Sequence, residues 1–191
     1  DLESKMLSSN DILELTNNEG GIEITSNMAI NPYNTYYKEL VSYLSDFDSG
    51  YIFTPFGTGH LYGSFLTCDF FDEPFNVHII GGKTHLKNTK ADKLYAPFNP
   101  FSVVDKNFID TKIAIRKVGR HSSIIEFKEE SLQEAIEIAI QNNFKVEPSA
   151  LGGLAAMIDT CNNLSIKCTE KKLVVVTGMS KIYAELNNVV M

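Results

Sequence analysis

The sequence lacks two features that would assign it to a membrane or to nucleic acid. A membrane-spanning helix needs about 18 or more consecutive apolar residues, and no stretch approaches that length. The formal net charge is −7, from 17 Lys and Arg against 24 Asp and Glu, whereas nucleic-acid phosphates require clustered Lys and Arg. No run of like charges is long enough to form a tail. We therefore expect neither a membrane nor a nucleic acid as partner.

Cysteine and histidine are scarce and scattered. The three cysteines, Cys68, Cys161 and Cys168, form no Cys-x-x-Cys pair, and the four histidines share no metal-ligand spacing with them. We predict buried free thiols, which fits a reducing, cytoplasmic compartment, although an odd number also leaves a redox role open. We predict no metal site. The spacing of these residues supports no nucleophile–base arrangement either, so no catalytic residue is assigned.

The length and composition predict one globular domain. The chain has 191 residues, of which 43% are hydrophobic and 21% are charged, and these are ordinary values for a globular protein. We interpret residues 1–191 as a single α/β domain. No signal peptide opens the sequence. It begins with Asp1 rather than Met, so we expect it to be part of a longer protein.

Apolar strands alternate with amphipathic helices along the chain, which predicts an α/β fold. We predict strands at 22–25, 51–56, 76–82, 111–118, 122–127 and 172–178. We predict helices at 8–21, 34–47, 60–71, 131–143 and 148–163, and an irregular excursion at 83–108. The helix at 131–143 carries a capping-box pattern, Ser131 with Glu134. The strand at 172–178 is apolar throughout, as in strands buried on both faces of a parallel sheet. We therefore predict a mainly parallel sheet flanked by helices, in three αβα layers.

Three glycines follow the strand at 51–56 in the stretch YIFTPFGTGHLYG. In an open α/β sheet, ligands bind beyond the carboxyl ends of the strands, and a helix that starts there offers backbone N–H groups to an anion. Gly57, Thr58, Gly59, His60 and Leu61 are therefore candidates to hold a phosphate. A tight turn without a ligand is the alternative. The stretch is neither a Walker loop nor a GxGxxG fingerprint.

Two later stretches also stand out, VEPSALGGLAAM and VVVTGMSK. Gly152 and Gly153 lie within a helical pattern, where each costs roughly 1 kcal/mol relative to Ala. We expect them to let the helix approach the sheet, or a cofactor ring, closely. Thr177 follows the apolar strand, where its hydroxyl can contact a ligand or act only as a cap.

Taken in order, these stretches resemble part of a known superfamily. NPYNTYYKELVSYL, GTGHLYG, EAIEIAI, KVEPSALGGLAAM and VVVTGMSK resemble the second half of fold-type II pyridoxal-phosphate (PLP) enzymes, the tryptophan synthase β-like superfamily. Threonine synthase and threonine dehydratase are the nearest members. The resemblance spans most of residues 10–180 and is weakest across 83–120. It implies an α/β fold and pyridoxal 5'-phosphate as cofactor.

The resemblance also implies roles for particular residues. It implies that the loop from Gly57 to Leu61 holds the cofactor phosphate and that Thr177 lies beside the pyridine nitrogen. Glu147 and Ser149 match a segment near the cofactor. The sequence departs from the family in two ways: His60 stands where the family usually has Gly, and the segment with the Schiff-base lysine has no counterpart. Lysines such as Lys38, Lys83 and Lys87 fall outside that motif.

Three functions remain open at this point. The first is the C-terminal portion of a PLP-dependent lyase or synthase acting on a small amino acid, inactive alone because the lysine belongs to an N-terminal remainder. The second is a non-catalytic ligand-binding or interaction domain that keeps the fold. The third is an unrelated nucleotide-binding α/β domain. The sequence upstream of Asp1 would separate the first two. The resemblance leaves the oligomeric state open, with a homodimer as the family's usual form.

Overall fold

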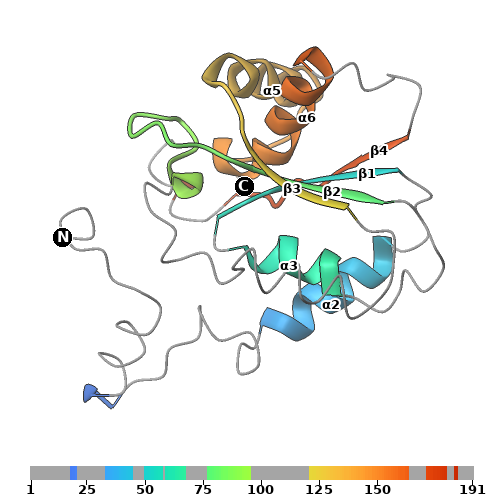
Figure 1. Ribbon diagram of the computed structural model, residues 1–191. Coiled ribbons are helices and arrows are strands. Elements are labelled where there is room, and N and C mark those ends of the chain that lie inside the picture. The colour runs from blue at the N-terminus through green and yellow to red at the C-terminus, as the bar shows by residue number, and fades with distance from the viewer. Residues whose placement is uncertain are drawn as a thin grey trace.

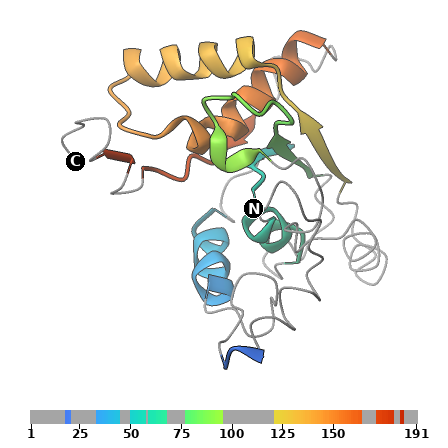
Figure 2. The same ribbon diagram turned by 90° about the vertical axis from the view of Figure 1, so that its left-hand side faces the viewer.

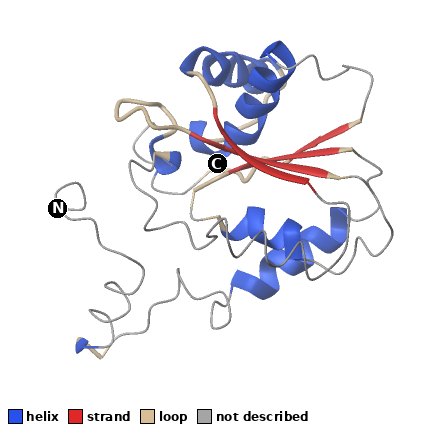
Figure 3. Ribbon diagram, in the orientation of Figure 1, coloured by secondary structure: helices blue, strands red, loops and turns tan. Residues whose placement is uncertain are grey.

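The computed structural model has three layers, with a sheet between two layers of helices (Figures 1 and 3). The structure describes residues 18–20, 33–44, 50–57, 59–67, 77–95, 121–163, 171–179 and 183–184. All statements below concern these residues. The predicted α/β fold with a parallel sheet and αβα layers is confirmed.

Four parallel strands form the described sheet. They are β1 (Tyr51–Pro55), β2 (His78–Lys83), β3 (His121–Glu126) and β4 (Lys172–Val174). Their order is β3-β2-β1-β4, with β1 central and paired to both β2 and β4. Ile52 pairs with Ile79 of β2 and with Leu173 of β4, which fixes the register. Because all four strands run in the same direction, their carboxyl ends meet at one edge of the sheet.

Helices cover both faces of the sheet. One layer contains α2 (Tyr33–Leu44) and α3 (His60–Thr67), and the opposite layer contains α5 (Glu129–Gln141) and α6 (Gly152–Asn163) (Figure 1). Successive side chains of β1 point to opposite faces of the sheet and so contact both helix layers. Ile52 packs in the cluster with Val41 and Phe65, whereas Phe53 packs with Ala156. Two short 3₁₀ helices, η1 (Asp92–Leu94) and η2 (Pro148–Leu151), lie against each other (Figure 2).

The start of α6 lies in direct contact with the strand backbone. A Cβ atom added at Gly153 would be 2.9 Å from the carbonyl oxygen of Phe53, and one added at Gly82 would overlap the carbonyl oxygen of Gly152. Both positions therefore exclude any larger side chain. The predicted close approach of the Gly152–Gly153 side of this helix to the sheet is confirmed.

The bounds of two predicted elements are wrong. The strand predicted at 172–178 ends at Val174, at one end of the described strand order, and Val176 is 42% exposed rather than buried on both faces. The helix predicted at 148–163 begins as the 3₁₀ turn η2 and becomes α-helical only at Gly152. The bounds of β1, β2, β3, α2 and α5 agree with the prediction to within a few residues, whereas η1 was not predicted.

The predicted capping box is also wrong. Helix α5 starts at Glu129 with Lys128 at the N-cap, so Ser131 lies inside the first turn. The Ser131 hydroxyl instead donates a 2.9 Å hydrogen bond to the buried carboxylate of Asp159 on α6. The strands predicted at 22–25 and 111–118, and most of the helix predicted at 8–21, lie outside the described residues.

Candidate ligand site at the carboxyl edge of the sheet

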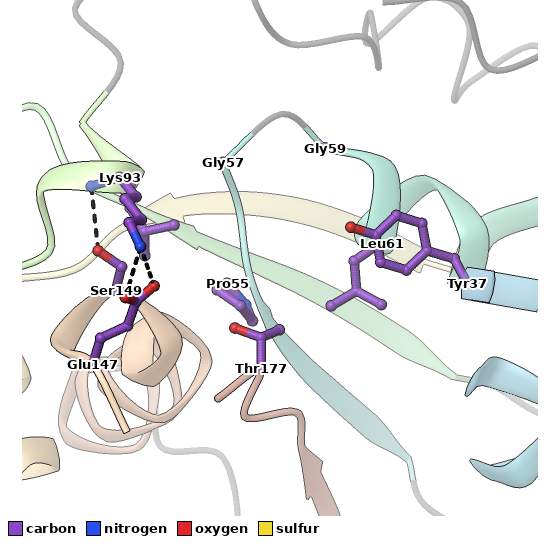
Figure 4. Close-up of a pocket in the computed structure, with 10 residues that line it drawn as sticks. Tyr37, Pro55, Gly57, Gly59, Leu61, Lys93, Glu147, Ser149 and Thr177 are labelled. Atoms are coloured by element: carbon purple, nitrogen blue, oxygen red, sulfur yellow. Dashed lines mark hydrogen bonds and ion pairs between the residues drawn. The ribbon is translucent and has the colours of Figure 1, made fainter. Parts of the chain in front are cut away.

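A pocket of about 320 Å³ opens at the carboxyl ends of β1 and β4 (Figure 4). Its volume is at the lower end of the range for small-molecule sites, about 300–1,000 Å³. Five segments that are distant in the sequence line it. The lining residues are Tyr37, Pro55, Gly57, Gly59, Leu61, Lys93, Leu94, Glu147, Ser149 and Thr177.

The loop between β1 and α3 forms one wall of the pocket. Gly59 has φ +87°, a left-handed conformation that strongly favours glycine. A Cβ atom at Gly57 would be 3.3 Å from the carbonyl oxygen of Lys93, so this glycine lets the loop pass close to η1. Helix α3 begins directly afterwards. The first hydrogen bond of this helix runs from the Gly63 N–H to Gly59 O at 2.8 Å. The N–H groups of that first turn have no acceptor within the helix, so they can donate hydrogen bonds to an anion.

The segment after β4 supplies the hydroxyl of Thr177. Val175 N–H still donates to Phe53 O at 2.9 Å, so the chain stays beside β1 past the last strand residue. Gly178, with φ +104°, then accepts a 3.2 Å hydrogen bond from the Glu147 N–H. Within the described residues, the Thr177 side chain is exposed and makes no hydrogen bond. Its hydroxyl is therefore available to a ligand in the pocket.

The opposite wall carries an ion pair between Lys93 of η1 and Glu147, the residue before η2. The Lys93 ammonium nitrogen lies 2.7 Å from Oε1 and 2.6 Å from Oε2 of Glu147 (Figure 4). The Lys93 side chain is 49% exposed and that of Glu147 only 12%. The backbone N–H of Lys93 also donates to Ser149 Oγ at 3.2 Å and to Asp92 Oδ1 at 2.9 Å. The pair is therefore fixed by contacts at both the side chain and the backbone.

Most of the predicted site residues come together in this pocket. Gly57, Gly59, Leu61 and Thr177 all line it. Thr58 and the side chain of His60 lie outside the described residues. Glu147 and Ser149, predicted to lie near a cofactor, line it as well. Their convergence is a finding about geometry, and their roles in binding stay predictions.

Lys93 is the site residue that sequence reasoning missed. It belongs to the stretch predicted to be an irregular excursion, and the described part of that stretch, residues 83–95, folds back on itself. Thr84 N–H donates to Leu94 O at 3.3 Å, and Thr84 forms a parallel bridge with Tyr95. Thr89 and Lys90 anchor the same loop to Glu129 of α5. These long-range contacts have no local sequence signal, so the placement of Lys93 could not be predicted.

The described residues contain neither a metal-binding cluster nor a helix that could cross a membrane. No group of three or more His, Cys, Asp or Glu residues is arranged to hold a metal ion within the part of the chain that the structure describes. In that same part, no helix is both long and apolar enough to span a bilayer.

Comparison with known proteins gives matches in structure alone. No family model and no curated protein matches the sequence. Serine racemase from Dictyostelium discoideum has a TM-score of 0.57 and 16% identity, over 88% of this chain and 57% of its own. The processed form of threonine deaminase isoform 2 from Solanum lycopersicum has a TM-score of 0.60 and 18% identity, over 93% and 54%. O-ureido-L-serine synthase has a TM-score of 0.61 and 15% identity, over 90% and 54%.

These matches establish the fold. At 15–18% identity a common fold is what the likeness shows, and the chain spans just over half the length of each of these structures. The fold that the sequence resemblance predicted is confirmed: the chain has the α/β fold found in part of the fold-type II PLP enzymes.

Proposed function

We propose that this chain is the C-terminal portion of a PLP-dependent enzyme of the lyase or synthase type that acts on a small amino acid. One observation carries the proposal. Gly57, Gly59 and the start of α3 share a pocket with Thr177, although about 120 residues separate the two segments. A phosphate site and a hydroxyl at a common sheet edge are what a phosphorylated pyridine needs.

The residues present fit this cofactor. The N–H groups at the start of α3 point along a helix dipole whose positive end stabilises a phosphate by roughly 0.3–1 kcal/mol. Thr177 holds a hydroxyl that can bond to the ring nitrogen. Leu61 and Leu94 also line the pocket and contribute apolar surface. When bound, PLP supplies an electron sink for amino-acid chemistry. The chain's own residues would bind its phosphate at the start of α3 and orient its ring at Thr177.

The proposal also covers the source of the catalytic lysine, the substrate, the oligomeric state and the cellular compartment. The Schiff-base lysine would come from an N-terminal remainder of the protein, so this chain is inactive alone. The names of its structural neighbours, a serine racemase, a threonine deaminase and an O-ureido-L-serine synthase, support a small amino acid as substrate. A threonine synthase-like reaction and a homodimer follow from the sequence resemblance. Cys161 is a free thiol, which supports a reducing compartment such as the cytoplasm.

A non-catalytic ligand-binding domain is the second candidate. The missing counterpart of the Schiff-base lysine favours it. In that case the pocket still binds a phosphorylated ligand, but no upstream segment supplies the lysine. The sequence of the complete gene upstream of Asp1 distinguishes the two candidates.

Binding of the cofactor can be tested by thermal unfolding. We expect PLP to raise the melting temperature of the chain more than pyridoxal does, because a ligand that binds only the native state stabilises it and the phosphate supplies the main contacts. Gly59→Val should remove the shift, since a branched residue cannot adopt φ +87° at the start of α3 without strain. Gly20→Val is the matched control: it has a similar φ of +70° in a segment outside the pocket.

Two different melting results would contradict the proposal. If millimolar PLP leaves the melting temperature of the parent unchanged, the chain does not bind the cofactor. If Gly59→Val responds to PLP as the parent does, the loop is a structural turn and the phosphate lies elsewhere.

A further inference from the structure

We propose that Lys93 determines the charge specificity of this pocket by neutralising Glu147, so that the pocket accepts an anionic, phosphate-bearing ligand. This inference rests on the proposed function, because it concerns the same site. It adds a residue to which neither the sequence nor the resemblance gives a role.

The charges that line the pocket lead to this inference. Among the described lining residues, Lys93 and Glu147 are the two that carry a charge. The Glu147 side chain is 12% exposed, so water screens it poorly. An uncompensated carboxylate at this position would repel a phosphate dianion bound at the start of α3, because like charges in a partly buried site interact more strongly than in water. The ammonium group of Lys93 removes that repulsion.

Several contacts hold the Lys93 ammonium group against the Glu147 carboxylate. Both carboxylate oxygens of Glu147 lie within 2.7 Å of the Lys93 nitrogen. The backbone of Lys93 is held by Ser149 Oγ, and the backbone N–H of Glu147 is bonded to Gly178 O. These contacts therefore fix the positions of the two charged residues relative to each other and to the segment that carries Thr177. Asp92, the acidic residue of η1, is exposed and is screened by solvent.

The opposite charges of the two residues make the proposal testable with a double-mutant cycle. Binding of inorganic phosphate, PLP and uncharged pyridoxine would be measured by titration calorimetry on the full chain. Lys93→Met should weaken phosphate and PLP by about threefold to tenfold and leave pyridoxine unchanged. Glu147→Gln should strengthen both anions, because Lys93 then contributes net positive charge. The double variant should return to within about twofold of the parent.

Two controls separate this effect from a general loss of charge or of folding. Lys93→Arg keeps the positive charge and should bind both anions as the parent does. Lys90→Met removes the same charge from the same loop, but Lys90 bonds to Gln133 outside the pocket, so anion binding should not change. The gain expected for Glu147→Gln cannot arise from partial unfolding, which only weakens binding.

Other binding results would contradict either the role proposed for Lys93 or the proposed function. If Lys93→Met and Glu147→Gln both bind phosphate as the parent does, the pair does not set charge specificity. If the double variant stays as weak as Lys93→Met, Lys93 contacts the anion itself and the neutralisation account is wrong. If the parent binds phosphate no more weakly than PLP, the proposed function fails, while the phosphate titrations still decide the role of Lys93. If the parent binds neither anion, both proposals fall.

Discussion

Adding one methyl group to β2 tests how closely the sheet and α6 approach each other. In Gly82→Ala the new Cβ would overlap the carbonyl oxygen of Gly152 and lie 2.8 Å from the Cβ atom of Ala156. The oxygen belongs to a helix backbone, so the whole of α6 must shift to make room. Overpacking of this kind typically costs 1–3 kcal/mol, and we expect about 3 kcal/mol here because the obstacle is backbone.

The adjacent residue provides a matched control. In Gly81→Ala the new Cβ lies on the opposite face, 2.9 Å from Cδ2 of the Phe56 ring and 3.2 Å from both Phe56 Cβ and the Tyr62 ring. Aromatic side chains can tilt away, so we expect a cost of about 1 kcal/mol. The same residue type changes to the same product in the same strand, but the nearest obstacle is a backbone oxygen at Gly82 and an aromatic ring atom at Gly81.

Thermal unfolding followed by circular dichroism measures the difference. For a chain of this size, 1 kcal/mol corresponds to roughly 2–4 °C in melting temperature, so Gly82→Ala should melt about 6–12 °C below the parent. Equal stability of the two variants would refute the reasoning, because it would mean that α6 does not lie against the backbone of β2.

Three further predictions follow from described contacts. Treatment with PLP and borohydride should leave no single lysine stoichiometrically labelled by mass spectrometry, because the Schiff-base lysine segment has no counterpart in this chain; one fully labelled lysine would contradict this. Ser131→Ala should lower the free energy of unfolding by about 1–3 kcal/mol, since it removes a donor to the buried Asp159 carboxylate. Ser42→Ala removes a hydroxyl whose bond to Glu39 O is exposed to solvent and should change the free energy of unfolding by no more than about 0.5 kcal/mol. Equal urea midpoints for the two variants would contradict the Ser131 account. Thr177→Val should weaken PLP binding in titration calorimetry without changing the melting temperature of the free chain, because the hydroxyl makes no hydrogen bond within the described residues; unchanged affinity would remove its role at the ring nitrogen.

The fold was predictable because its signals are local and periodic. The apolar run of β1 and the alternating glycines around α3 mark a strand that leads into a helix. The Gly152–Gly153 pair indicated close packing, and the structure confirms it at the carbonyl oxygen of Phe53. The bounds of the last strand were wrong because its apolar residues say nothing of its position at one end of the strand order.

Most of the candidate site could be predicted from the sequence, but the placement of Lys93 could not. Gly57, Gly59 and Thr177 follow strands, and parallel strands bring their carboxyl ends to one edge. Lys93 reaches the pocket only because Thr84 and Thr89 fold its loop back against the rest of the chain. Ser131 carried a helix-cap pattern, but its hydroxyl bonds to Asp159 instead, since tertiary contact outweighs a local preference. Such contacts become visible only in three dimensions.

A crystal structure of this chain grown with PLP tests the central claim most directly. The account predicts the phosphate at the start of α3, with its oxygens about 2.7–3.2 Å from backbone nitrogens within residues 57–61, and the ring nitrogen beside the Thr177 hydroxyl. Density for the phosphate on surface lysines, or an empty pocket at a PLP concentration ten times the measured Kd, would contradict it.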